Sequence, residues 1–235
     1  MKTLANGIYQ LDLGKANVFL LESKNGLALV DTEVVGAKAR LVSALKKNGL
    51  ALRDIRHILV THAHVDHVGG LREVQAATGA QVWAHRLDAP FIVKGEHPPY
   101  PERSQLSLFD RMVGTMIQSF VGDEQPPAPV HHEVEEGDVL SEVREGLRAI
   151  HLPGHSPGQV GFWLEPERVL IGGDVAMHLL PWLHLPLGAY TPDMKEAKRS
   201  IRKVATLKPH TLGIGHGAPL VGNAEAKVAR LARSL

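Results

Sequence analysis

The chain has 235 residues, of which 44% are hydrophobic and 22% charged, an ordinary composition for one globular domain with a sizeable core. Its formal net charge of +1 leaves no large basic surface and therefore does not imply a nucleic-acid partner. The absence of cysteine excludes disulfides and thiolate ligands, so any metal site must be built from His, Asp or Glu.

The first predicted elements form a meander of antiparallel strands. Short apolar runs at residues 8–13, 18–21 and 27–30 are separated by turn residues at Gly14 and Asn25-Gly26. Asp31 ends the third run, where we expect it either to cap a turn or to accept a hydrogen bond from a metal-binding histidine. Residues 37–50 carry apolar side chains at helical spacing, which predicts a surface helix.

The densest motif, His62-x-His64-x-Asp66-His67, directly follows the apolar run at residues 58–60. This run predicts a buried strand, and His62 and His64, two residues apart on an extended backbone, project to the same side. Asp66 and His67 fall where helical periodicity begins, so one strand-to-helix turn presents four candidate ligands. Imidazole and carboxylate suit zinc, although iron, manganese and nickel accept the same donors.

Another strand is predicted at residues 81–84, and the alternation of strands and helices predicts a layered α/β fold. Between residues 86 and 132 the strand pattern lapses, and the proline-rich stretch 96–101 must be extended. Apolar side chains then recur in steps of three and four from Leu106 to Phe120, which predicts an amphipathic helix rich in Met and Phe. Packing on the core, a lid over the metal edge and a dimer contact remain open for this helix.

The remaining candidate ligands follow strands of a second predicted sheet. Apolar runs occupy residues 130–134, 147–152, 159–164 and 169–171. His155 follows one run in a rigid Gly/Pro turn, and Asp174 ends another run after two glycines. A carboxylate can bridge two cations because each of its oxygens can bind one. His216 lies between glycines after a further run, and it completes a set of seven candidate ligands.

In this order, the motifs resemble those of the metallo-beta-lactamase superfamily, whose members are mostly hydrolases with two metal ions. The resemblance covers nearly the whole chain and implies a single domain, residues 1–235, with the segment at about 86–132 as a helical and proline-rich insert. It implies an α/β fold, the four-layered αββα sandwich of two mixed β-sheets flanked by helices, with the site at one sheet edge. The implied ligands are His62, His64 and His155 for one ion, Asp66, His67 and His216 for the other, and Asp174 as the bridge.

Two divalent ions about 3.5 to 4 Å apart can share a water and lower its pKa from 15.7 toward about 7, which makes hydroxide available as a nucleophile. Asp66 would orient this hydroxide and then carry its proton. We therefore expect a dinuclear zinc-dependent hydrolase that cleaves a lactone, thioester or carboxylic ester of a small, partly apolar substrate. The apolar loop at residues 177–190 is expected to form pocket wall, and its candidate substrate contacts are Met177, His178, Trp182 and Tyr190.

Departures from individual subfamilies limit the choice of substrate. Beta-lactamases of the superfamily usually lack an Asp at the position that bridges the two ions, whereas this chain has Asp174 there. Antibiotic hydrolysis is therefore not expected. Glyoxalase II-like thioesterases share the bridge but add a helical carboxy-terminal part, whereas one predicted helix follows His216 here. Quorum-quenching lactonases have a tyrosine three residues after the bridging Asp, where this chain has Met177. A mononuclear iron persulfide dioxygenase-like oxidoreductase and a phosphodiesterase on the same fold remain as alternatives.

The expected partner is a small-molecule substrate. Neither a basic arm nor an apolar run as long as a membrane span is present, so no nucleic acid and no membrane are expected. No signal-peptide pattern precedes the first strand, which favours a cytoplasmic protein. A homodimer stays open, because the Met/Phe helix would suit such a contact.

Overall fold

The computed structural model describes residues 1–179 and 181–235; Leu180, in the predicted apolar loop, lies outside the described residues. Its first sheet has seven strands in the order of the chain. The first four pair antiparallel, and the last three add on in parallel through helical connections. The strands are β1 (Lys2–Ala5), β2 (Ile8–Asp12), β3 (Asn17–Ser23), β4 (Gly26–Val30), β5 (Ile55–Leu59), β6 (Gln81–His85) and β7 (His132–Val134).

The second sheet has five strands in the order β14-β13-β10-β9-β8, with β10 and β13 parallel and the other pairs antiparallel. A separate two-stranded hairpin follows β10. These strands are β8 (Leu147–His151), β9 (Val160–Leu164), β10 (Val169–Ile171), β11 (Met177–Leu179), β12 (Trp182–His184), β13 (Thr211–Gly213) and β14 (Leu220–Val221). Both large sheets are therefore mixed, as predicted.

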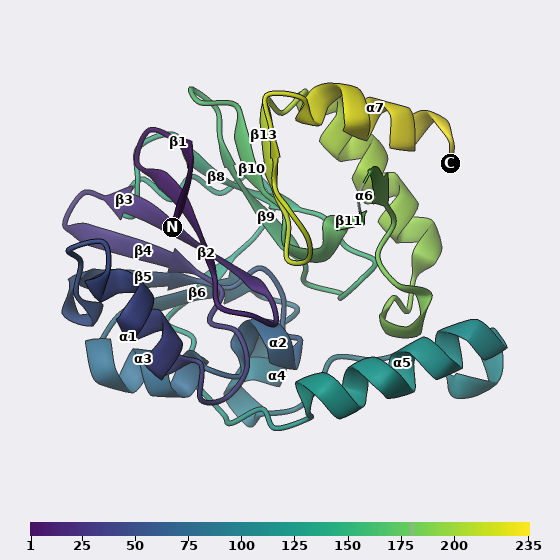
Figure 1. Cartoon of the computed structure of the whole chain (residues 1–235), viewed down its shortest axis with the longest axis horizontal. Helices are drawn as coiled ribbons and strands as arrows, with labels where there is room; N and C mark the ends of the chain where they lie inside the picture. The colour runs from purple at the N-terminus through teal and green to yellow at the C-terminus, as the bar shows by residue number, and fades with distance from the viewer. Residues whose placement is uncertain (180) are drawn as a thin grey trace.

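Helices cover the outer faces of both sheets (Figure 1). On the first sheet lie α1 (Lys38–Lys46) and α3 (Leu71–Thr78), and on the second lie α6 (Met194–Leu207) and α7 (Ala224–Arg233). Three further helices are α2 (Val65–Val68), α4 (Ala89–Lys94) and α5 (Leu108–Val121). Short 3-10 turns occupy Leu52–Asp54, Arg103–Gln105, Gly173–Val175 and Gly188–Tyr190.

The alternation of side chains along each strand explains the four layers. In β3, Phe19 points toward the second sheet and packs in one cluster with Phe162 of β9. Its neighbour Leu20 points the other way and packs with Leu71 of α3. Because both faces of the strand are covered, its sequence is a nearly continuous apolar run. The αββα sandwich predicted from the motifs is confirmed.

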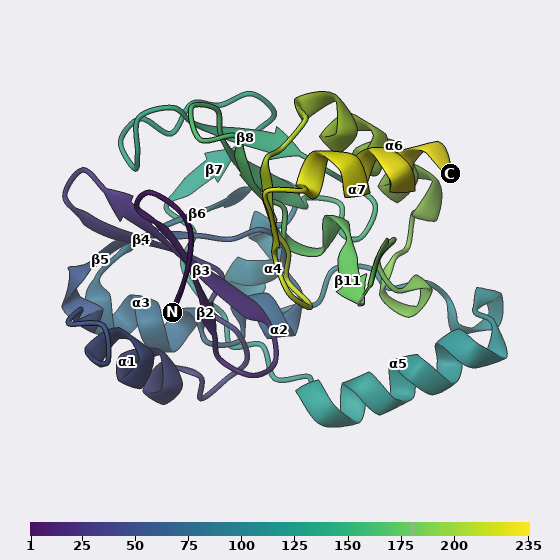
Figure 2. The same cartoon turned by 45° about the horizontal axis from the view of Figure 1, so that its top comes forward.

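The helix predicted within the segment 86–132 is α5, which begins at Leu108, after an N-terminal cap from Ser107. No residue of α5 is fully buried, so the interpretation that it packs into the core is wrong. Figure 1 and Figure 2 show α5 at one edge of the molecule, apart from both sheets. Its nearest packed element is the 3-10 turn Gly188–Tyr190.

Candidate metal centre

The seven predicted ligands converge where strands of both sheets end. His62 and His64 follow β5, whereas Asp66 and His67 belong to α2, whose first residue comes directly after His64. The remaining three come from the other sheet, after β8, β10 and β13. Their ligand atoms form three groups, each within 4.8 Å: His62, His64 and His155; His62, His67 and Asp174; and Asp66, His67 and His216.

The first group consists of buried neutral histidines. Burial lowers the pKa of His62 and of His64 well below the ordinary value, and it lowers that of His155 to about 4. His64 Nδ1 and His155 Nε2 face each other at 2.9 Å. All three rings are therefore neutral at pH 7, the form in which imidazole offers a lone pair to a cation.

Two threonines fix which ring nitrogen of these histidines carries the proton. The Thr61 hydroxyl donates to Asp31 Oδ2 at 2.7 Å, so it can only accept from His62 Nδ1, 3.0 Å away. The Thr191 hydroxyl donates to the Leu187 carbonyl and likewise accepts from His155 Nδ1 at 3.1 Å. In both rings the hydrogen-bond network assigns the proton to Nδ1, which leaves the Nε2 lone pair directed into the centre.

The second group is rich in carboxylate. His216 Nε2 lies 3.1 Å from Asp66 Oδ2 and 3.2 Å from Asp174 Oδ2, and His67 Nε2 lies 3.5 Å from Asp174 Oδ1. Burial opposes a charge on His216, but the carboxylates of Asp174 and Asp66 outweigh it and raise its pKa to about 10. Burial is likewise outweighed at His67, whose pKa the carboxylates, led by Asp31, raise. This half of the centre therefore attracts positive charge, as protons or as a metal ion.

The donor set fits divalent metal ions. His62 Nε2, His67 Nε2 and Asp174 Oδ1 are buried, yet they have no hydrogen-bond partner among residues 1–179 and 181–235. Buried polar atoms normally have partners, so atoms of this kind clustered at one point indicate a ligand. Gly215 leaves room beside them, because a Cβ at this position would meet Asp174 Oδ1 and the His67 ring. The clustered donors, the unsatisfied atoms and the glycine together support a metal centre.

Asp31 occupies the supporting position that the sequence suggested. His67 Nδ1 lies 2.7 Å from Asp31 Oδ2, and because a carboxylate accepts, the ring N–H donates. The other oxygen of Asp31 accepts from the Thr61 backbone N–H at 2.8 Å. Asp31 thereby fixes the orientation of His67 and, through Thr61, of His62.

Asp88 is a supporting residue that sequence reasoning missed. Its fully buried carboxylate accepts from the backbone N–H groups of Ala63, at 2.8 Å, and of Gly158, at 2.6 Å, and from the Ser156 hydroxyl. It therefore ties the loop of His62 and His64 to the loop of His155. The sequence gives no signal for this link, because Asp88 has no motif around it and its partners lie far along the chain.

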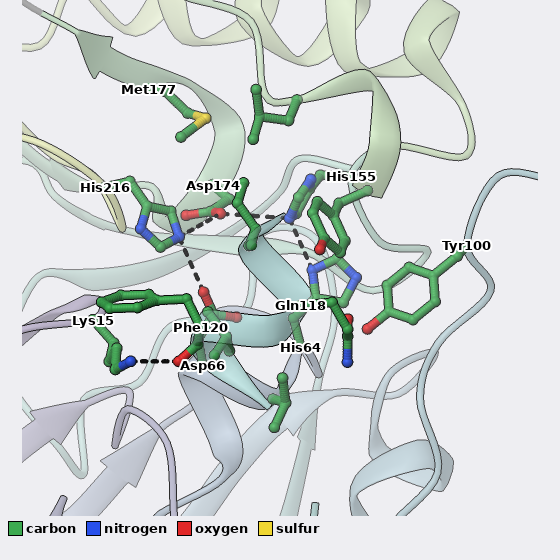
Figure 3. A pocket seen from close by; sticks show the side chains of 15 residues that line it. Lys15, His64, Asp66, Tyr100, Gln118, Phe120, His155, Asp174, Met177 and His216 are labelled. Carbon is green, nitrogen blue, oxygen red and sulfur yellow. Dashed lines mark hydrogen bonds and ion pairs between the residues drawn. The ribbon is translucent and has the colours of Figure 1, made fainter. Parts of the chain in front are cut away.

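A cavity of about 230 Å³ opens onto the metal centre (Figure 3). Its floor carries His64, Asp66, His155, Asp174 and His216. Its walls are mostly apolar and come from α5, β11, the turn before α6, the first residue of α2, the turn between β2 and β3, and the proline-rich segment before α5. The wall residues are Lys15, Val65, Tyr100, Ile117, Gln118, Phe120, Val121, Met177, Leu187 and Tyr190.

Two of the four candidate substrate contacts line this cavity and two do not. Met177 and Tyr190 are wall residues. His178 follows Met177 on β11 and therefore points to the opposite side, where its ring nitrogens face the Ala218 carbonyl and Lys227 Nζ. Trp182 lies outside the cavity as well, half exposed beneath the guanidinium of Arg230 at 4.1 Å.

The α5 wall is attached to the body at two points. The Tyr190 hydroxyl donates to the Gly114 carbonyl at 2.8 Å. Lys15, in the turn between β2 and β3, donates to the Phe120 carbonyl, and its Nζ lies 3.1 Å from the centre of the Phe120 ring. Lys15 and Tyr100, whose ring stacks on His64 at 5.2 Å, are wall residues that the sequence pattern did not single out.

Comparisons with known proteins agree with this geometry. Residues 11–216 match the family model of the metallo-beta-lactamase superfamily. "Probable metallo-hydrolase YflN" of Bacillus subtilis (strain 168) is 26% identical over 98% of this chain and 92% of that protein. "Hydroxyacylglutathione hydrolase GloC" of Haemophilus influenzae is 26% identical over 66% of this chain and 63% of that protein. A crystal structure of TTHA1623, described as a di-iron-bound form, has a TM-score of 0.68 with 27% identity, covering 94% of this chain and 98% of that one.

Among the described residues, no helix has both the length and the apolar character that crossing a membrane requires.

Proposed function

The chain belongs to the metallo-beta-lactamase superfamily, and from this premise we propose that it is a dinuclear metal-dependent hydrolase that cleaves an ester-type bond of a small, partly apolar substrate. The bond is a lactone, thioester or carboxylic ester. The observation that carries the proposal is the convergence of five histidines and two aspartates at one centre, which forms the floor of the cavity through His64, Asp66, His155, Asp174 and His216. A relative named as a hydroxyacylglutathione hydrolase supports the thioester among these three.

In this proposal the two halves of the centre hold one ion each, with His62, His64 and His155 at one, Asp66, His67 and His216 at the other, and Asp174 shared. Zinc is the first choice, because neutral imidazole and carboxylate suit it. Iron is the main alternative, and a similar structure described as di-iron-bound supports testing for it. Such ions, when bound, lower the pKa of water and polarise a carbonyl oxygen.

The protein's own groups supply orientation and proton transfer. Asp66 lines the cavity beside His216 and is the carboxylate in position to orient an attacking water and accept its proton. Asp31 and the two threonines hold the ligand rings in fixed orientations, so little reorganisation is needed when substrate binds. The wall of α5 excludes bulk water from one side of the cavity.

The apolar wall indicates which end of the substrate lies there. Ile117, Val121, Met177 and Leu187 surround a space that suits an acyl chain or the ring carbons of a lactone. We expect kcat/KM on a series of acyl esters or thioesters to rise from acetyl to hexanoyl, because each added methylene is buried. A rate that is independent of acyl length would contradict this placement.

The proposal is tested by measuring the metal content of the purified protein together with rates on thioesters, lactones, aryl esters and phosphodiesters. We expect two divalent ions per chain and activity on at least one ester-type substrate. His62→Ala and Asp174→Ala should each lower kcat/KM by at least about 100-fold, since each removes a ligand. His210→Ala, which changes an exposed histidine outside the centre, is the matched control and should leave the rate unchanged.

Three outcomes would overturn this function. Unchanged ester hydrolysis in both ligand variants would exclude a metal-dependent mechanism. One iron per chain with oxidation of persulfides would establish the oxidoreductase instead. Activity confined to phosphodiesters would make the enzyme a phosphodiesterase, which cleaves a different class of bond.

A further inference from the structure

Exposed large apolar side chains are concentrated on α5, which carries five of the thirteen found among the described residues. Five of its side chains are between 63% and 82% exposed, whereas most large apolar side chains elsewhere are covered. Four of them recur at every fourth position and form a continuous stripe along the helix, with the fifth beside it. We call these residues the α5 stripe: Leu108, Met112, Met116 and Phe120, with Phe109 alongside.

Most of the stripe cannot turn inward, because the opposite side of α5 is already used; Phe120, at the C-terminal end of the stripe, also lines the cavity, where Lys15 Nζ lies over its ring. Ile117 and Val121 line the cavity, and the Gly114 carbonyl accepts from Tyr190. Any rotation that buried Met112 and Met116 against the body would withdraw these contacts. The apolar face is therefore held outward by the same attachments that build the pocket wall.

The charges of α5 argue against a membrane or a highly charged partner. The stripe itself has no charged residue, Lys15 lies over the Phe120 ring at one end of it, and the whole helix holds one acid and one base, Asp110 and Arg111. Helices that lie on anionic membranes carry many Lys and Arg residues on their polar face. A stripe without charged residues is instead best covered by another uncharged, apolar protein surface.

The spacing of the stripe makes it complementary to a second copy. If two α5 helices pair antiparallel about a two-fold axis between positions 112 and 116, Met112 faces Met116 of the partner subunit. The same axis places Leu108 opposite Phe120 of the partner subunit. Every member of the four-residue series thus meets another member, which is the condition for an isologous contact.

The available area is sufficient for such a contact. At roughly 200 Å² for each fully exposed side chain of this size, and about two thirds exposure, the α5 stripe presents roughly 650 Å². If all five side chains were fully covered, two copies would bury at most about 1,300 Å², at the low end of the range of about 1,200 to 2,000 Å² for stable interfaces. We propose that the α5 stripe is the contact through which two copies of this chain form a two-fold symmetric dimer.

The first test is the molar mass in solution, measured by sedimentation over a range of concentrations. The wild-type protein should show twice the chain mass of 25.5 kDa at micromolar concentrations. Met112→Glu combined with Met116→Glu should give the monomer mass, because like charges would then face each other. Val42→Glu, at an exposed apolar position on α1, is the matched control and should remain dimeric.

A charge-pair variant tests the predicted register. In Met112→Glu with Met116→Lys, each new acid faces a new base of the other copy, so the dimer should be retained or restored. A parallel arrangement would instead bring identical charges together and give monomers. Because all these positions are more than 60% exposed, the variants should fold, and circular dichroism melting checks this.

The lack of cysteine permits a direct crosslink as a second measurement. Under mild oxidation, a mixture of Met112→Cys and Met116→Cys proteins should form a covalent dimer at least tenfold faster than either protein alone. Equal rates would contradict the proposed register. A wild-type protein that is monomeric at 100 µM, or a monomer that binds neutral or anionic lipid vesicles through the stripe, would overturn the dimer.

Discussion

At the scale of single residues, the centre depends on side chains that never touch a substrate. Asp88 is an example, because its carboxylate accepts hydrogen bonds from three donors and lies outside the cavity. Burial raises its pKa, while the hydrogen bonds from Ser156 and the two backbone N–H groups oppose this rise and favour the ionised form. A buried acceptor with this many partners fixes the position of two loops at once.

Asp88→Asn should therefore destabilise the fold by about 2–4 kcal/mol, because an amide group turns one oxygen into a donor and leaves at least one backbone N–H without an acceptor. Denaturant unfolding measures this cost. Ser156→Ala removes one donor only and should cost about 1 kcal/mol. An Asp88→Asn variant as stable as the wild type would show that the carboxylate does not contribute to the free energy of unfolding.

The residue scale also shows what the sequence could and could not predict. The sequence singled out all seven side chains that the structure brings together, since each lies in a short motif that follows an apolar run. Asp88 and Thr191 were missed, because their partners lie 25 to 70 residues away and nothing local marks them. His178 was assigned to the substrate, but strand alternation turns it away from the cavity.

At the scale of elements, α5 is a wall that is held by few contacts. The Tyr190 hydroxyl and Lys15 attach it, and its residues are only partly covered by the body. The periodicity of the sequence predicted this helix and its apolar face. It did not predict where the helix lies, because apolar residues in steps of three and four show that one face is apolar but not which part of the protein covers that face. The short strands β1 and β11 were not predicted either, since each lacks a run long enough to stand out.

Tyr190→Phe tests the attachment of α5. Removing the hydroxyl should raise KM severalfold with little change in kcat, because the wall is loosened while the metal ligands stay in place. Tyr9→Phe, which removes a hydroxyl bound to Glu22 on the surface, is the matched control for steady-state kinetics. Equal KM values in wild type and Tyr190→Phe would mean that this hydrogen bond does not hold α5 in its position beside the cavity.

At the scale of the whole molecule, the centre joins the two halves of the chain. The first sheet and its helix contribute four of the ligands, and the second sheet contributes three. A metal ion bound by both halves exists only in the folded state, so its binding free energy adds to the stability of the fold. The sequence predicted this convergence because ligands at strand ends of two stacked sheets share one edge.

Removal of the metal should therefore lower the melting temperature. With free metal about 1,000-fold above its dissociation constant, the loss is about 4 kcal/mol, or roughly 8–16 °C for a chain of this size. Differential scanning calorimetry with and without a chelator measures it, and added zinc should restore the original value. A His62→Ala variant should respond much less, and an unchanged wild-type melting temperature would contradict metal binding in the folded state.

The two central residues of the α5 stripe, Met112 and Met116, make the proposed dimer sensitive to oxidation at sulfur. Thioethers at positions 112 and 116 are exposed, and peroxide converts such groups to polar sulfoxides, which suit water better than an apolar contact. No sulfur belongs to the ligand set, and the chain has no thiol to intercept the oxidant. Mild oxidative stress would thus weaken the contact between the subunits without oxidising a sulfur ligand of the centre, and methionine sulfoxide reductases could reverse the change.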